Sequence, residues 1–151
     1  MAYIAGFLDG DGSLMLQIKK RKDVRNGIRF MATVCFYQDS RHKDPLSWIQ
    51  SQLGAGYLSH RKDGISELRI NGFKQVKQIL FELMPFIRFK KIQAEALLTA
   101  CTLLEGRRLS YLNESELRLL VDCIVKIQSS NYITKYKKTR EELLLSLGLT
   151  P

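Results

Sequence analysis

Two stretches of alternating apolar and polar residues, joined by a polar turn, constrain the fold of this chain more than any other feature. In residues 14–18 and 30–36 every second side chain is apolar, which is the period of a strand buried on one face. The turn between them contains Asn26-Gly27, a pair that favours a hairpin. We therefore expect a long antiparallel hairpin. Its inward residues would be Leu14, Leu16, Ile18, Phe30, Ala32, Val34 and Phe36.

Helical and extended patterns alternate along the rest of the chain. We expect helices at 2–9 and 43–53, a third from 73 to just before Pro85, and a second hairpin at 56–61 and 65–71. Helices at 89–105 and 114–128 and a short last one follow, and Asn113 with Glu116 and Thr139 with Glu142 form capping-box patterns. The order α-β-β-α-β-β-α, followed by C-terminal helices, predicts a single α+β domain over residues 1–151 with an antiparallel sheet.

Composition limits the class of protein. With 45% hydrophobic and 26% charged residues, the chain of 151 residues has the composition of a globular domain. It has no apolar run long enough to span a membrane, and its N-terminus reaches an acidic residue too early for a targeting peptide. The odd count of three cysteines predicts buried thiols in a reducing compartment. The net charge of +9 would attract nucleic acid, an anionic membrane surface or an acidic partner, without choosing among them.

The outward positions of both hairpins are cationic and polar. A solvated sheet face explains such a pattern in one strand, but the same bias in four strands of a +9 chain favours a sheet that reads the major groove of DNA. The first hairpin contributes Gln17, Lys19, Arg21, Arg29, Met31, Thr33, Cys35 and Tyr37, and the second contributes Ser59, Arg61, Glu67 and Arg69.

An acidic pair follows the first predicted helix, in the segment Asp9-Gly10-Asp11-Gly12-Ser13. Carboxylates are unfavourable at the negative end of a helix unless a cation compensates them, and Mg²⁺ or Ca²⁺ prefers such oxygen ligands. A polar, glycine-rich turn without a metal is the alternative. Within the helix, Gly6 beside Ala5 provides a small-residue surface, which predicts close packing against a second copy of the same helix.

The segment from Ile4 to Gly12, IAGFLDGDG, resembles the LAGLIDADG motif of the homing endonucleases. One copy is present, which implies the single-motif, intron-encoded subgroup that acts as a homodimer on near-palindromic double-stranded DNA. In that subgroup the motif helices of two subunits pack together. The resemblance therefore assigns Ile4, Ala5, Gly6, Phe7 and Leu8 to a dimer interface.

The resemblance also implies the roles of individual residues. Asp11 corresponds to the acidic residue that binds catalytic Mg²⁺, with Mn²⁺ or Ca²⁺ possible at the same site, and the Gly10 carbonyl is a backbone ligand. Asp9 corresponds to the acid that more often caps or orients than ligates.

Two further positions match active-site residues of the family. Gln38 falls where a polar side chain organises water, and Lys90 falls where a lysine faces the scissile phosphate. Arg88 and Lys91 compete with Lys90 for this role.

Near the C-terminus, Lys135, Lys138 and Thr139 precede a helix and predict phosphate contacts, with a solvated basic tail as the alternative. Trp48 is expected in the core. The sequence thus predicts a metal-dependent, site-specific DNA endonuclease, inside an organelle or a prokaryotic cytoplasm. An RNA-binding splicing cofactor that binds intron RNA and a non-cleaving DNA-binding regulator are the rival hypotheses.

Overall fold

The computed structural model describes residues 1–20, 27–131 and 136–151, and it confirms the predicted order of elements. Short 3₁₀ turns occupy Ser40–His42 and Leu109–Tyr111. The helices and strands are α1 (Ala2–Asp11), β1 (Gly12–Lys20), β2 (Ile28–Asp39), α2 (Asp44–Leu53), β3 (Tyr57–His60), β4 (Ile65–Asn71), α3 (Phe73–Leu83), α4 (Lys91–Leu104), α5 (Glu114–Ser130) and α6 (Arg140–Ser146).

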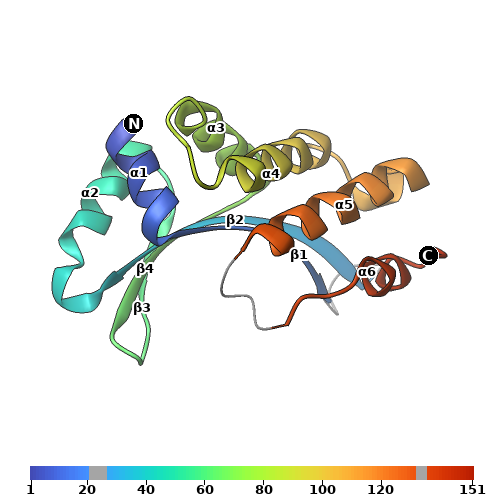
Figure 1. Ribbon diagram of the computed structural model, residues 1–151, viewed down its shortest axis with the longest axis horizontal. Coiled ribbons are helices and arrows are strands. Elements are labelled where there is room, and N and C mark those ends of the chain that lie inside the picture. The colour runs from blue at the N-terminus through green and yellow to red at the C-terminus, as the bar shows by residue number, and fades with distance from the viewer. Residues whose placement is uncertain (21–26, 132–135) are drawn as a thin grey trace.

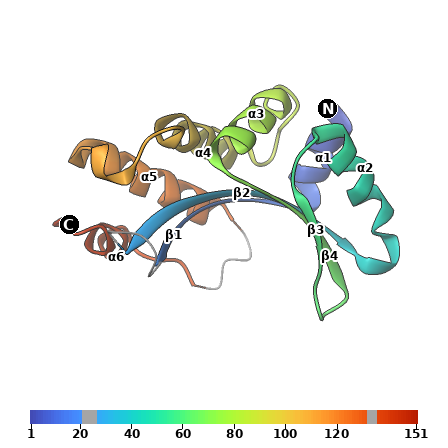
Figure 2. The same cartoon turned by 180° about the vertical axis from the view of Figure 1, so that it is seen from behind.

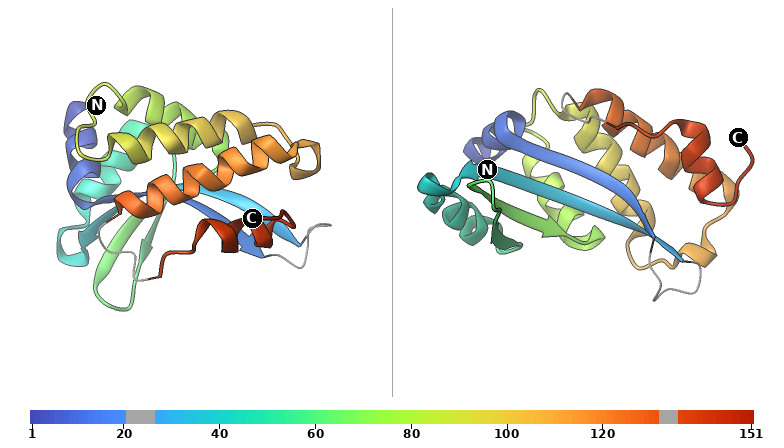
Figure 3. Two further views of the ribbon diagram at one scale, coloured as in Figure 1. Left: turned by 45° about the vertical axis from the view of Figure 1, so that its right-hand side comes forward. Right: turned by 90° about the horizontal axis from the view of Figure 1, so that it is seen from below.

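The strands form one antiparallel sheet in the order β1-β2-β4-β3. Helices α3, α4 and α5 lie along one face of this sheet (Figures 1 and 2). Within the ranges that the structure describes, no helix covers the opposite, concave face, which is seen from below in Figure 3. Because cross-strand partners share a face, alternate residues of each strand are divided between the helical layer and this open face.

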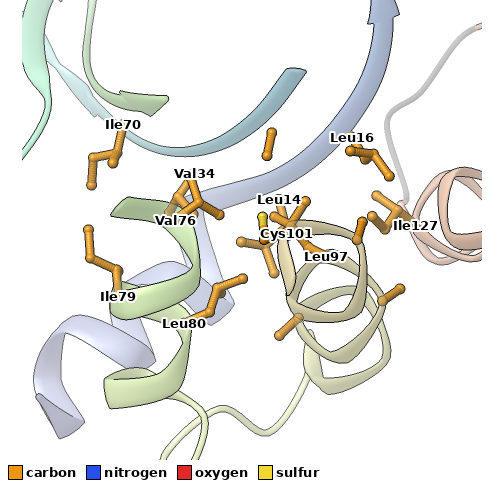
Figure 4. Packing of buried hydrophobic residues seen from close by; sticks show 14 of the residues in the cluster. Leu14, Leu16, Val34, Ile70, Val76, Ile79, Leu80, Leu97, Cys101 and Ile127 are labelled. Atoms are coloured by element: carbon orange, nitrogen blue, oxygen red, sulfur yellow. The ribbon is translucent and has the colours of Figure 1, made fainter. Parts of the chain in front are cut away.

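The core lies between the sheet and the helical layer (Figure 4). Strand residues Leu14, Leu16, Val34 and Ile70 meet Val76, Ile79 and Leu80 of α3, Leu97 and Cys101 of α4, and Ile127 of α5. Burial of one such aliphatic side chain contributes about 1.5–3 kcal/mol. The predicted inward set is confirmed, with Ile18 only partly buried.

Local signals in the sequence also have their expected structural outcome. Both capping boxes are present, at the starts of α5 and α6. Each of the three cysteines is free and buried, as predicted. In the part of the chain that the structure describes, no helix is both long and apolar enough to cross a membrane.

The prediction that Trp48 lies in the core is wrong. Its side chain is 46% exposed and meets the Tyr3 ring edge to face, with 5.6 Å between the ring centroids. Helix α2 buries Leu46 and Ile49 instead. Trp48 follows Leu46 by two residues, about 200° around the helix, and therefore points away from the core.

Candidate active site and nucleic-acid interface

The acidic pair lies where α1 ends and β1 begins. Asp11 is the last residue of α1 and is exposed, while Asp9, one half-turn earlier, is buried at 9% exposure. Gly12 makes the junction possible, because a Cβ there would lie 2.7 Å from the Leu8 carbonyl oxygen. The two carboxylates therefore have different environments although only one residue separates them.

Asp9 accepts hydrogen bonds from the turn that precedes α4. Its Oδ2 accepts from the backbone N–H groups of Arg88 (2.7 Å) and Phe89 (3.2 Å), and its Oδ1 accepts from that of Lys90 (3.0 Å). These bonds agree with the orienting role that the resemblance implied, and they leave Asp11 as the acid of this pair that is open to a ligand.

The Lys90 side chain folds back onto the C-terminal end of α1. Its Nζ donates to the carbonyl oxygens of Leu8 (2.9 Å), Asp9 and Gly10 (3.3 Å). Burial lowers the pKa of Lys90, although the charges of Asp9 and Asp11 act in the opposite direction. An ammonium group at the negative end of a helix is favourable, so the chain itself supplies a cation to this site.

Lys90 is thereby distinguished from its two competitors. The side chains of Arg88 and Lys91 are exposed, whereas Lys90 lies beside the two acids of the motif. The carbonyl of Gly10, predicted as a metal ligand, accepts a hydrogen bond from Lys90, so a metal at this oxygen would share it with the ammonium group or displace that group.

Gln38 lies at the same end of the sheet. Gly12 of β1 pairs with Phe36 of β2, which places Gln38 two residues beyond the α1–β1 junction along β2. Its Oε1 accepts from the backbone N–H of Asp39 (2.9 Å).

The neighbouring acid, Asp39, is paired with an arginine two residues further along the chain. Arg41 donates to both carboxylate oxygens of Asp39, through Nε (3.0 Å) and Nη2 (2.8 Å). These hydrogen bonds hold the pKa of Asp39 well below its usual range.

The predicted dimer residues of α1 divide into two sets. Ile4, Ala5 and Leu8 are buried in the core of their own chain, so the assignment of these three side chains to an interface is wrong. Helix α1 must cover the end of its own sheet, and it uses this apolar side to do so. Phe7 is partly buried and stacks on Phe36, with 6.2 Å between the ring centroids.

The other side of α1 is open. A Cβ added at Gly6 or Gly10 would meet no described atom within 4 Å outside the helix. Tyr3, on the same side, is 68% exposed. This open side, made of Tyr3, Gly6 and Gly10, is where a second helix can approach closely.

The concave face of the sheet carries the predicted outward residues, but three of them are buried. Thr33 (1% exposed) donates to the Oδ1 of Asn71 (2.7 Å), and Cys35 (0%) donates to Glu67 (8%) at 3.8 Å. Burial raises the pKa of Cys35 to about 11. The assignment of Thr33, Cys35 and Glu67 to direct DNA contacts is therefore corrected, because these side chains are buried and bonded to neighbours on the same face.

The remaining outward residues keep some access to solvent. Lys19 and Arg29 are exposed, and Arg61 pairs with Asp63 (2.6 Å) in the β3–β4 turn. Those that are partly buried are Gln17, Met31, Tyr37, Ser59 and Arg69. Arg21 lies outside the described residues.

The concave face includes residues that the sequence-based prediction missed, among them Tyr57 and Asn71. Tyr57 pairs across β3–β4 with Arg69, so it shares this face, and it is 50% exposed. Asn71 pairs with Thr33 across β2–β4. Each is adjacent in sequence to an inward residue, Leu58 or Ile70, and this alternation could have placed both on the outward face.

At the C-terminus, Lys138 is exposed and Lys135 lies outside the described residues. The hydroxyl of Thr139 accepts from the Glu142 N–H (3.2 Å), and the Glu142 carboxylate accepts from the Thr139 N–H (2.7 Å). Thr139 is therefore used in its own helix cap, where the Glu142 carboxylate would repel a phosphate.

A single chain offers few clustered oxygen donors for a metal ion at the α1–β1 junction. Over residues 1–20, 27–131 and 136–151 no group of three or more His, Cys, Asp or Glu side chains is arranged to hold a metal ion. The junction offers the Asp11 carboxylate and the Gly10 carbonyl, which are ligands of the type that Mg²⁺ prefers.

Comparison with known proteins gives the relatives of this chain. Residues 4–96 match the family model for LAGLIDADG endonucleases. The chain is 36% identical to the DNA endonuclease I-CvuI of Chlorella vulgaris over 99 residues, which are 64% of this chain and 60% of that protein. It is 28% identical to the DNA endonuclease I-CreI of Chlamydomonas reinhardtii over 142 residues, 94% of this chain and 84% of that one.

Solved structures show the same fold. A crystal structure of I-CvuI in complex with the I-CreI target superimposes with a TM-score of 0.74 at 26% identity, covering 99% of this chain and 95% of that one. The archaeal endonuclease I-Vdi141I, complexed with DNA, gives a TM-score of 0.80 at 20% identity, covering 97% and 92%. With the family match over residues 4–96 and the α-β-β-α-β-β-α order in place, this chain belongs to the LAGLIDADG endonuclease family.

Proposed function

We propose that this chain is a site-specific endonuclease that cleaves near-palindromic double-stranded DNA as a homodimer, by metal-assisted hydrolysis of a phosphodiester in each strand. The observation that carries this proposal is the junction of α1 and β1. There an exposed Asp11 and a lysine held against the α1 carbonyls lie at the edge of an open cationic sheet. Neither a regulator nor a splicing cofactor requires this arrangement.

The homodimer is supported by the surface of α1. Gly6 and Gly10 leave the helix backbone open on the side away from the core, and small residues allow two helices to approach closely. Each chain carries one motif. Pairing the two α1 helices along this side would bring one Asp11 from each copy toward a common axis.

A divalent cation such as Mg²⁺ fits the donors at the junction. Asp11 and the Gly10 carbonyl supply two oxygen atoms, and Mg²⁺ is octahedral and commonly retains water and substrate phosphate in the remaining positions. Mn²⁺ or Ca²⁺ would accept the same oxygen donors. When bound, such an ion lowers the pKa of a water molecule and stabilises charge on the phosphate.

The residues of the chain then have separate tasks. Water attacks the scissile phosphorus in line and expels the 3′ oxygen, with the amide of Gln38 orienting solvent near the phosphate. The ammonium group of Lys90 stabilises the added negative charge. Asp9 fixes the backbone of Lys90 through three N–H bonds to the turn, and is a positioning residue.

Sequence recognition is assigned to the concave face. Its exposed and partly buried residues would contact base edges and phosphates in the major groove, with Lys138 contributing to the phosphate contacts. The residues proposed for the groove are Gln17, Lys19, Arg29, Met31, Tyr37, Tyr57, Ser59, Arg61 and Arg69, and Arg21 and Lys135 stay predictions. The three buried free thiols support a reducing compartment inside the cell.

Cleavage of plasmid DNA tests the proposal. The substrate is a plasmid that carries the exon junction into which the coding sequence of this chain inserts, with Mg²⁺ or with EDTA. We expect a double-strand cut with Mg²⁺ and none with EDTA or with Asp11→Asn, while Asp11→Asn still binds the plasmid. Binding without cleavage by the wild type would favour the regulator. Preference for the intron transcript over the DNA would favour the splicing cofactor.

A further inference from the structure

A largely buried ion pair lies on the concave face, among the outward residues that the alternation assigned to reading DNA. Glu67 and Arg69 are neighbours on the same side of β4, with side chains 11% and 25% exposed. The Oε1 of Glu67 accepts from Nε (3.3 Å) and Nη2 (3.2 Å) of Arg69, and its Oε2 accepts from the same Nη2 (3.2 Å).

Other strands also hold Glu67 in place. Ser59 of β3 donates to its Oε1 at 3.1 Å, and Cys35 of β2 donates to its Oε2 at 3.8 Å. Burial works against ionisation of Glu67, but the hydrogen bonds and charge of Arg69 outweigh it, so the pKa of Glu67 lies below its usual value. With both oxygens engaged, Glu67 would have to break an existing bond to accept one from a base.

The geometry leaves one edge of the Arg69 guanidinium for a ligand. Nε and Nη2 bond to Glu67, and among the described residues Nη1 donates no hydrogen bond. If one hydrogen of Nη2 serves both Glu67 oxygens, the edge formed by Nη1 and the other hydrogen of Nη2 is available to a ligand. Two parallel N–H groups of an arginine match the O6 and N7 acceptors of guanine in the major groove.

We propose that Glu67 is a positioning residue for DNA recognition: it holds the Arg69 guanidinium so that its free edge reads a guanine in each half-site. This inference rests on the proposed function, because it assigns the concave face to DNA. Glu67 itself does not contact the base. The bonds to Glu67 already restrict the conformations of the Arg69 side chain before DNA binds. Less conformational entropy is therefore lost when the contact with guanine forms.

Selection from random DNA tests this inference. A pool of duplexes, randomised in both half-sites, is bound by the wild type, Glu67→Gln and Arg69→Lys in Ca²⁺ without Mg²⁺, and the recovered duplexes are sequenced. For the wild type we expect guanine to be favoured at one base pair of each half-site by about 5- to 150-fold. Both variants should reduce this preference to less than about 3-fold at that base pair and leave the others unchanged.

The chain offers a matched control. Asp63 pairs with Arg61, also two residues away, but both side chains are 50% exposed. Asp63→Asn changes the net charge by the same amount as Glu67→Gln, so a general effect of charge on affinity is common to both variants. Asp63→Asn should leave the guanine preference intact, because an exposed pair restricts its arginine little.

Distinct outcomes would overturn the inference. An unchanged guanine preference in Glu67→Gln would exclude positioning, and a change at a base pair that Arg69→Lys leaves alone would make Glu67 a direct reader. Loss of preference at all positions would indicate a structural role. If Glu67→Gln does not fold, Glu67→Asp is used instead, because it retains the carboxylate one methylene further back. The loss of guanine preference in Glu67→Asp should be confined to the same base pair. A wild type that selects no sequence would overturn the proposed function as well.

Discussion

Replacing the two acids of the motif by their amides should separate stability from cleavage. Asp9→Asn should mainly lower the stability of the fold, whereas Asp11→Asn should mainly lower the rate of DNA cleavage. Asp9→Asn removes an acceptor that is 9% exposed and holds three backbone N–H groups, whereas Asp11→Asn alters an exposed side chain. The two changes are chemically identical and one residue apart. Any difference between them therefore comes from the environment that the fold gives each carboxylate.

The size of the Asp9 effect follows from its contacts. An amide oxygen in place of Oδ2 can still accept from Arg88 and Phe89, but its NH₂ group then faces the N–H of Lys90. One bond to a charged acceptor is lost and one partly buried N–H is left unpaired, which together cost about 2–4 kcal/mol. For a domain of this size that lowers the melting temperature by about 5–15 °C. Asp11→Asn should remain within about 0.5 kcal/mol of the wild type.

Cleavage should show the reverse order. An amide is a poor ligand for Mg²⁺, so Asp11→Asn should reduce the cleavage rate by about 100-fold or more, equivalent to about 3 kcal/mol or more of transition-state stabilisation. DNA affinity should be retained or rise slightly, since a carboxylate near the phosphates is removed. Asp9→Asn should still cleave, at a reduced rate, because the Lys90 turn is loosened.

The assays are thermal unfolding at one fixed protein concentration, and plasmid cleavage with gel-shift affinity at a temperature where each variant is folded. Unfolding of Asp9→Asn at the wild-type temperature would refute the role given to its three hydrogen bonds. Cleavage by Asp11→Asn at the wild-type rate in Mg²⁺ would refute the role of Asp11 as a metal ligand.

Three further predictions concern the partner surfaces. DNA binding should weaken steeply with salt, with about 0.9 in the slope of log K against log salt for each phosphate neutralised, and a slope near zero in a titration would remove nucleic acid as the partner. Gly6→Leu should leave the protomer folded, because its side chain meets open space, but should separate the two copies in analytical ultracentrifugation; a dimer at micromolar concentration would contradict this. Glu67→Gln should lower the free energy of unfolding by about 1–3 kcal/mol at pH 7. Since the folded-state pKa of Glu67 is lowered, this difference should persist above about pH 4.3 and shrink as the pH falls through the folded value; a difference that grows in acid would refute it.

The sequence by itself determined the elements and their order. Alternation at 14–18 and 30–36, capping boxes and turn residues are local signals, and the backbone responds to them within a few residues. The motif segment likewise identified Asp11 and Asp9 as acids at the end of the first helix, because their position relative to that helix is set by near neighbours alone.

Only the tertiary structure decided which of the candidate side chains meet. Asp9 bonds to the N–H groups of residues about 80 positions away, and the turn held in this way lets the Lys90 side chain reach the carbonyl oxygens of α1, which distinguishes Lys90 from Arg88 and Lys91. Alternation assigned Thr33, Cys35 and Glu67 to the outward face correctly, but their burial depends on which side chains the neighbouring strands place beside them. Which side of α1 is open was undetermined for the same reason. Local periodicity specifies a direction for each side chain, whereas burial depends on what the rest of the chain places in that direction.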